Sequence, residues 1–229
     1  MTTPDTFIPF AGCLSANASA KTRLAFVGIP DDSQSSYRWR CSRAPSLIRS
    51  AYDGRCFNAT TESGVDLTES VLDLGDLEPR DTWDSSANLY RETVECALDD
   101  NKVPFIVGGD HAITVPVVQA FRSFADPVHV VQIDAHPDLY SDYKGSPHSH
   151  ACVAARLLEM DHVASLTQLG IRTLNDEQSK QIVRFHDRLR LMFARDLTGT
   201  LPALRHIPDD APVYLTVDMD GFDPAFAPG

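Results

Sequence analysis

The 229-residue chain has 43% hydrophobic and 23% charged residues, a balance typical of a soluble globular protein with a substantial core. Its formal net charge of −12 argues against nucleic acid as the main partner, because phosphate binding requires clustered Lys and Arg. The same charge is compatible with a cationic substrate. No apolar run is long enough to span a membrane, so we expect no membrane partner.

The N-terminus lacks the basic start and the sustained apolar stretch of a signal peptide, and we interpret residues 1–22 as a flexible lead-in. The five cysteines are odd in number, widely spaced and without a CxxC pair. This spacing disfavours a zinc ribbon or a disulfide framework and favours reduced thiols. We therefore expect a cytoplasmic protein.

Apolar runs and helical periodicities alternate along the whole chain. In chain order they predict a strand over 23–30, a helix over 42–53, a strand over 71–77, a helix over 81–100, a strand over 103–109, a helix over 114–124, a strand over 127–133, a helix over 149–160, a strand over 165–171, a helix over 175–189, and strands over 189–195 and 212–217. Such alternation is typical of parallel βαβ units. We expect a single α/β domain, a three-layer αβα sandwich around a mainly parallel sheet.

Three of the predicted strands end in Asp and His residues. "VPFIVGGDH" ends in Asp110 and His111, and "VVQIDAHPD" ends in Asp134, His136 and Asp138. The third, "VYLTVDMDGFDP", delivers Asp218, Asp220 and Asp223. Sites in parallel α/β sheets form beyond the carboxyl ends of the strands, so these side chains should converge there.

The i, i+2 spacing within these segments places alternate side chains on one side of an extended chain. Four carboxylates and two imidazoles would then meet, and four carboxylates cannot all stay ionised without compensating positive charge. Two divalent cations supply that charge. Oxygen and nitrogen ligands without thiolate suit Mn²⁺, with Ni²⁺, Fe²⁺, Co²⁺ or Zn²⁺ as alternatives. Two such metals can share a bridging water, lower its pKa and so perform hydrolysis without a protein nucleophile.

The segments GGDH (108–111), DAHPD (134–138) and DMDGFDP (218–224) resemble the three signature segments of the ureohydrolase family, which comprises arginases, agmatinases and guanidino-acid hydrolases. Residues 28–52 and 169–178 also resemble segments of that family. The resemblance implies an arginase-like fold, two Mn²⁺ ions, a homo-oligomer (trimer or hexamer), and release of urea and an amine from a guanidino compound.

The resemblance also implies roles for individual residues. One metal would be held by His111, Asp134, Asp138 and Asp218, and the other by Asp134, His136, Asp218 and Asp220. His150 would carry a proton to the leaving amine, a role for which His148 is the competitor. Asp142, in the predicted substrate loop, is interpreted as a solvated loop charge, with contact to a substrate amine as the alternative.

The loop from Leu139 to His148 lacks the pattern with which arginases bind an α-amino acid, and is more similar to the agmatinase branch. We therefore expect agmatine or a similar small cationic guanidino compound as substrate. A guanidino acid, guanidine itself or arginine are the alternatives, and amide deacetylation on the same metal scaffold is a third. Family members continue beyond the position of Gly229, so the resemblance implies that the C-terminal part of the domain is missing. A truncated and inactive remnant is then the rival interpretation.

Overall fold

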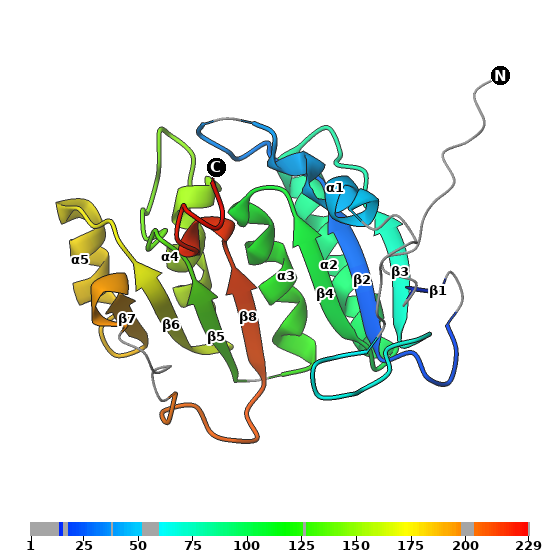
Figure 1. The fold of residues 1–229 in the computed structure, drawn as a ribbon. Coiled ribbons are helices and arrows are strands. Elements are labelled where there is room, and N and C mark those ends of the chain that lie inside the picture. The colour runs from blue at the N-terminus through cyan, green and yellow to red at the C-terminus, as the bar shows by residue number, and fades with distance from the viewer. Residues whose placement is uncertain are drawn as a thin grey trace. The chain divides into compact units, whose positions relative to one another are not determined.

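The computed structural model describes residues 14–15, 18–37, 39–51, 60–125, 127–197 and 204–228. The chain divides into two compact units, Met1–Ile113 and Thr114–Gly229 (Figure 1). The lead-in predicted for residues 1–22 lies for the most part outside the described residues. Within it, Leu14 and Ser15 form a short strand, and Thr22 is buried.

The first unit is a parallel four-stranded sheet in the order β1-β3-β2-β4. Its elements are β1 (Leu14–Ser15), β2 (Leu24–Ile29), α1 (Ala44–Ser50), β3 (Val71–Asp76), α2 (Trp83–Asp99) and β4 (Val103–Gly108). The central strand β2 carries the fully buried Phe26 and Ile29, and α2 buries Tyr90 and Val94. A 3₁₀ turn, His111–Ile113, follows β4 after two intervening residues and ends the unit.

The second unit is a parallel four-stranded sheet in the order β7-β6-β5-β8. Its elements are α3 (Thr114–Ala120), β5 (Val128–Ile133), α4 (Val153–Leu158), β6 (Val163–Ile171), α5 (Asp176–Arg184), β7 (Leu189–Phe193) and β8 (Val213–Val217). Residues of α4, β5 and β6, among them Val130, Leu157 and Leu166, form its apolar core.

The α/β class with parallel strand pairing is confirmed in both units. Several boundaries differ from the prediction. The helix expected over 149–160 begins with a 3₁₀ turn, His150–Cys152, and α4 ends at Leu158, with Glu159 as its C-cap. The helix expected over 175–189 ends at Arg184, because Phe185 turns inward and is buried. Among the helices in the described ranges, none combines the length and apolar character needed to cross a membrane.

Candidate metal centre

The second unit brings two of the predicted ligand segments together at the ends of neighbouring strands. Strands β5 and β8 pair in parallel with Ile133 opposite Val217, so the next residues, Asp134 and Asp218, leave the sheet at the same level. The backbone N–H of Asp218 donates to the carbonyl of Ile133 at 2.9 Å. A carboxylate oxygen of Asp218 lies within 4.8 Å of one of Asp134. The convergence expected from the strand order is therefore present between these two strands.

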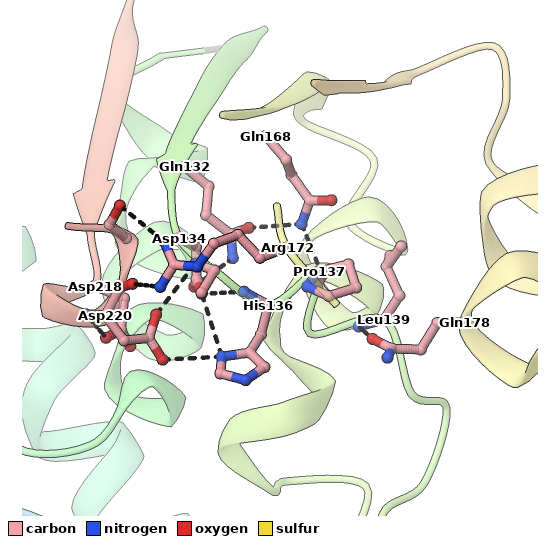
Figure 2. A network of polar contacts seen from close by, with 12 residues as sticks. Gln132, Asp134, His136, Pro137, Leu139, Gln168, Arg172, Gln178, Asp218 and Asp220 are labelled. Atoms are coloured by element: carbon pink, nitrogen blue, oxygen red, sulfur yellow. Dashed lines mark hydrogen bonds and ion pairs between the residues drawn. The ribbon is translucent and has the colours of Figure 1, made fainter. Parts of the chain in front are cut away.

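Asp134 is the most enclosed member of the cluster, with a relative exposure of 1%. Its Oδ1 accepts a hydrogen bond from the backbone N–H of His136 at 2.7 Å, and its Oδ2 accepts one from Nε2 of Gln132 at 2.9 Å (Figure 2). Each carboxylate oxygen has further lone-pair capacity, so both retain a position for a cation. A buried carboxylate with this capacity is suited to bridging two metals.

His136 and Asp220 form an ion pair at the edge of the cluster, with Nδ1 2.9 Å from Oδ2 (Figure 2). The hydrogen bond to Asp220 raises the pKa of His136 to about 9, against partial burial that lowers it. Burial pulls the pKa of Asp220 upward, yet the bond from His136 outweighs it and lowers the pKa to about 2. One atom each of Asp134, His136 and Asp220 lie within 4.8 Å of one another. The carboxylates around His136 therefore favour its positively charged form.

The backbone around Asp220 is fixed by contacts that converge on it. Asp218 caps the 3₁₀ turn Met219–Gly221, since its Oδ1 accepts from the N–H of Asp220 at 3.1 Å. Asp220 Oδ1 in turn accepts from the N–H of Ala135 at 3.1 Å. The guanidinium of Arg172, which follows β6, donates to the carbonyls of Asp220 and Gly221 (Figure 2). The two ligand segments are therefore tied to each other through their main chains.

Asp138 ends the segment 134–138 that follows β5, and it is also buried. Its φ of 47° falls in the left-handed region, which is uncommon for a residue other than glycine and marks a constrained position. Its carbonyl accepts from the N–H of Ala154 at 3.0 Å, which anchors the loop to the first turn of α4.

His111 belongs to the first unit, where it begins the 3₁₀ turn after β4. The preceding residues are held against the loop that follows β2. A side chain at Gly109 would meet the carbonyl oxygen of Asp31 at 1.9 Å, so the two backbones approach too closely for any other residue. Asp110 accepts from the N–H groups of Gln34 and Ala112, both at 2.9 Å, and burial raises its pKa to about 7. Asp110 thus fixes the loop beside His111, and the role of His111 as a ligand stays a prediction.

The remaining predicted site residues lie in the loop between Asp138 and α4. His150 is the first residue of the 3₁₀ turn His150–Cys152, and Ser149 caps that turn by accepting from the N–H of Ala151. Asp142 is exposed, and its Oδ1 accepts from the N–H of Gly145 at 2.8 Å. This bond gives Asp142 a turn-forming role, in keeping with its interpretation as a loop charge. His148 is exposed on the same loop.

Sequence reasoning missed three polar residues around the cluster, Gln132, Gln168 and Arg172. Gln132 could have been noticed in the sequence, because it is a polar residue in a mainly apolar strand and stands two residues before Asp134, on the same side of the strand. Gln168 lies on β6 and Arg172 directly follows that strand, and only the pairing of β5 with β6 places them near Asp134.

The comparisons with known proteins agree with this geometry. The model of the Arginase family matches residues 22–229. Arginase 1, mitochondrial, of Arabidopsis thaliana is 33% identical over 223 residues, covering 92% of this chain and 65% of that protein. Among solved structures, arginase from Medicago truncatula has a TM-score of 0.81 at 30% identity, covering 91% of this chain and 69% of that one. The agmatine ureohydrolase of Thermoplasma volcanium has a TM-score of 0.76 at 33% identity, with coverages of 91% and 70%.

The chain belongs to the arginase family, the class of amidinohydrolases that the ligand segments and the parallel sheets define. The arginase-like fold predicted from the sequence is confirmed by the solved structures. The chain spans about two thirds of the length of the curated relatives it matches.

Proposed function

We propose that this chain carries the metal-binding part of an enzyme that hydrolyses a guanidino compound to urea and an amine. The observation that supports the proposal is the gathering of Asp134, Asp218, Asp220 and His136 at the carboxyl ends of β5 and β8. Membership of the arginase family supports the same reaction class.

The donor set fits a pair of divalent cations of the manganese type. It consists of carboxylate oxygens and imidazole nitrogens, which suit Mn²⁺ and tolerate ions such as Ni²⁺. One cation would be held by His111, Asp134, Asp138 and Asp218, and the other by Asp134, His136, Asp218 and Asp220. When bound, the two cations would supply Lewis-acid activation of a water near the guanidinium carbon. Because His136 must be neutral to ligate, cation binding would displace the proton that it now shares with Asp220.

The chain's own residues would orient and exchange protons around that centre. His150 is the proposed proton carrier, which delivers a proton to the nitrogen of the leaving amine. A histidine suits this task because its unperturbed pKa lies near neutral pH. Asp142 is also proposed to contact the far amine of the substrate, because this residue is exposed although its Oδ1 accepts from the N–H of Gly145.

We propose agmatine or a similar small cationic guanidino compound as the substrate. The net charge of −12 and the loop from Leu139 to His148, which lacks the arginase pattern, support this choice. The likeness to the Thermoplasma volcanium agmatine ureohydrolase supports it as well. Arginine is the second candidate, because relatives at a similar level of identity are named arginases.

The experiment is a urea assay of the Mn²⁺-loaded protein with agmatine, arginine, 4-guanidinobutyrate and guanidine. We expect urea from agmatine above the others. His150→Gln should lower kcat by about 10²- to 10⁴-fold, the usual contribution of a positioned acid or base. His148→Gln, on the same loop, is the matched control and should retain most of the activity. No urea from any of the four with both metals bound would overturn the proposed reaction and favour an inactive remnant.

The family resemblance also leads us to propose a homo-oligomer, a trimer or a hexamer. Light scattering coupled to gel filtration measures this directly, and a monomer at micromolar concentration would contradict it.

A further inference from the structure

Two glutamines form a buried pair beside the candidate metal ligands. Gln132 on β5 and Gln168 on β6 stand directly opposite each other in the parallel register, and both have a relative exposure of 0%. Nε2 of Gln168 donates to Oε1 of Gln132 at 2.9 Å (Figure 2). Long amides are seldom fully buried in a protein core, because each polar atom must find a partner there.

The pair contacts both halves of the segment that carries the ligands. At one end, Nε2 of Gln132 donates to Oδ2 of Asp134 at 2.9 Å. At the other, Nε2 of Gln168 donates to the carbonyl oxygen of Pro137 at 2.6 Å. Pro137 directly precedes Asp138, whose backbone lies in the left-handed region. The two amides therefore hold one ligand by its side chain and the next through its neighbouring peptide group.

The donor and acceptor chemistry permits only one direction along this chain of bonds. The Oδ2 of Asp134 and the carbonyl oxygen of Pro137 both act as acceptors here, and each receives an N–H of an amide. Turning the amide of Gln132 would set its oxygen against the Asp134 carboxylate, and turning that of Gln168 would set its oxygen against the Pro137 carbonyl. Each amide is thus fixed by a group in the ligand segment.

The amide of Gln168 is held by its donors alone. Within the described residues, its Oε1 is buried and accepts no hydrogen bond. An unsatisfied buried acceptor destabilises the folded state, so an apolar side chain of the same size would be tolerated at position 168 if the amide served packing only.

We propose that Gln132 and Gln168 act as one positioning unit that orients Asp134 and the Pro137–Asp138 peptide for cation binding. This inference rests on the proposed metal site. The glutamines do not touch the cations in this account. They fix the ligands before a cation arrives, so that less of the binding energy is used to order them.

The test compares Mn²⁺ affinity in Gln132→Met and Gln168→Met with a matched control, Thr167→Val. Methionine keeps the length of the side chain and removes the amide. Thr167 is the buried neighbour of Gln168 on β6; its side chain points to the other face of the sheet and bonds His206 at 2.9 Å. The control therefore also loses a partly buried hydrogen bond from the same strand, on the face of the sheet opposite to Gln168.

The readouts are the free Mn²⁺ signal in electron paramagnetic resonance titrations and the Tm of the metal-free protein. We expect each glutamine variant to bind Mn²⁺ about 10- to 100-fold more weakly, the usual effect of removing a partner of a metal ligand. Thr167→Val should stay within about threefold of the unaltered chain, although its metal-free Tm falls as well. Because the two amides act together, the double variant should lose no more affinity than the weaker-binding single variant.

Unaltered affinity in both glutamine variants, or an equal loss in Thr167→Val, would overturn the proposal. If a methionine variant does not fold, Gln132→Asn and Gln168→Asn withdraw the amide by one methylene, and the same loss is expected. Failure of the proposed function can be told apart from failure of the glutamine proposal. An unaltered chain that binds Mn²⁺ without forming urea discards the reaction while the affinities still decide on the glutamines. An unaltered chain that takes up no Mn²⁺ overturns both.

Discussion

At the scale of single residues, the backbone of Asp134 is enclosed by two glycines. A side chain at Gly170 would lie 3.1 Å from the carbonyl oxygen of Asp134, and one at Gly221 would lie 2.9 Å from its nitrogen. Gly170 also has a φ of +98°, which residues with a side chain rarely adopt. The position of the central carboxylate therefore depends on the absence of side chains around it.

Gly170→Ala should destabilise the protein more than Gly145→Ala. Both glycines have a positive φ, and an alanine there costs about 1–2 kcal/mol. A Cβ at Gly145 meets nothing within 4 Å, whereas at Gly170 it presses on the Asp134 carbonyl. Urea denaturation midpoints measure the difference. Equal losses would mean that the close approach to Asp134 carries no energetic weight.

Cys152 should resist alkylation in the native protein while Cys96 reacts. Burial raises the pKa of the Cys152 thiol to about 11, and only the thiolate is a strong nucleophile. Cys96 is exposed on α2. At pH 8, iodoacetamide should therefore label Cys96 within minutes and leave Cys152 unlabelled, with the rate at Cys152 rising as the pH approaches 11. Peptide mass spectrometry provides the measurement, and comparable labelling of both residues at pH 8 would refute this prediction.

At the scale of elements, the side chain of Arg49 connects α1 to β3 in the first unit. The guanidinium of Arg49 makes a bidentate pair with Asp73, with distances of 3.0 and 2.9 Å, and a further ion pair with Asp76. Its Cζ lies 4.6 Å from the ring centroid of Phe26 on β2. Arg49 and Asp73 are both buried, so neither charge is compensated by water.

Arg49→Met should cost about 3–5 kcal/mol, because it leaves the Asp73 carboxylate buried without its partner. Arg91→Met on α2 is the control. Arg91 pairs with Glu95 one turn along the helix, both side chains remain partly accessible to water, and i,i+4 helix pairs of this kind contribute about 0.3–0.5 kcal/mol. The free energy of unfolding in urea measures both changes. A loss at Arg49 no larger than at Arg91 would contradict the assigned role.

Much of the order of helices and strands was predictable, because the hydrophobic periodicity of each segment agrees with the residues that end it. The run ending in Ile133 and the run ending in Val217 were predicted as strands, and each ends where its Asp follows. Tertiary contacts decided the ends that were mispredicted. Phe185 leaves α5 to join the apolar core, although its neighbours continue a helical pattern. The convergence of Asp134 with Asp218 could be predicted from the strand order, whereas the partnership of Gln132 with Gln168 depends on strand register, which a single sequence does not reveal.

At the scale of the whole molecule, the acidic charge and the donor set favour the same partners. A chain of net charge −12 attracts cations in general, both divalent metals and guanidinium compounds. The second unit gathers part of its acidity at the carboxyl edge of one parallel sheet, where His136 balances Asp220. Two divalent cations would neutralise that edge and should stabilise the folded chain by mass action.

The most direct measurement of the central claim is the metal content per chain after Mn²⁺ loading and dialysis, by plasma mass spectrometry. We predict two equivalents for the unaltered chain, about one for Asp220→Asn, and none for Asp134→Asn, which removes the proposed bridge. Asp223→Asn is the control, since Asp223 holds a turn through the N–H of Ala225, and it should retain two. No bound manganese in the unaltered chain, or two equivalents in Asp134→Asn, would contradict the account.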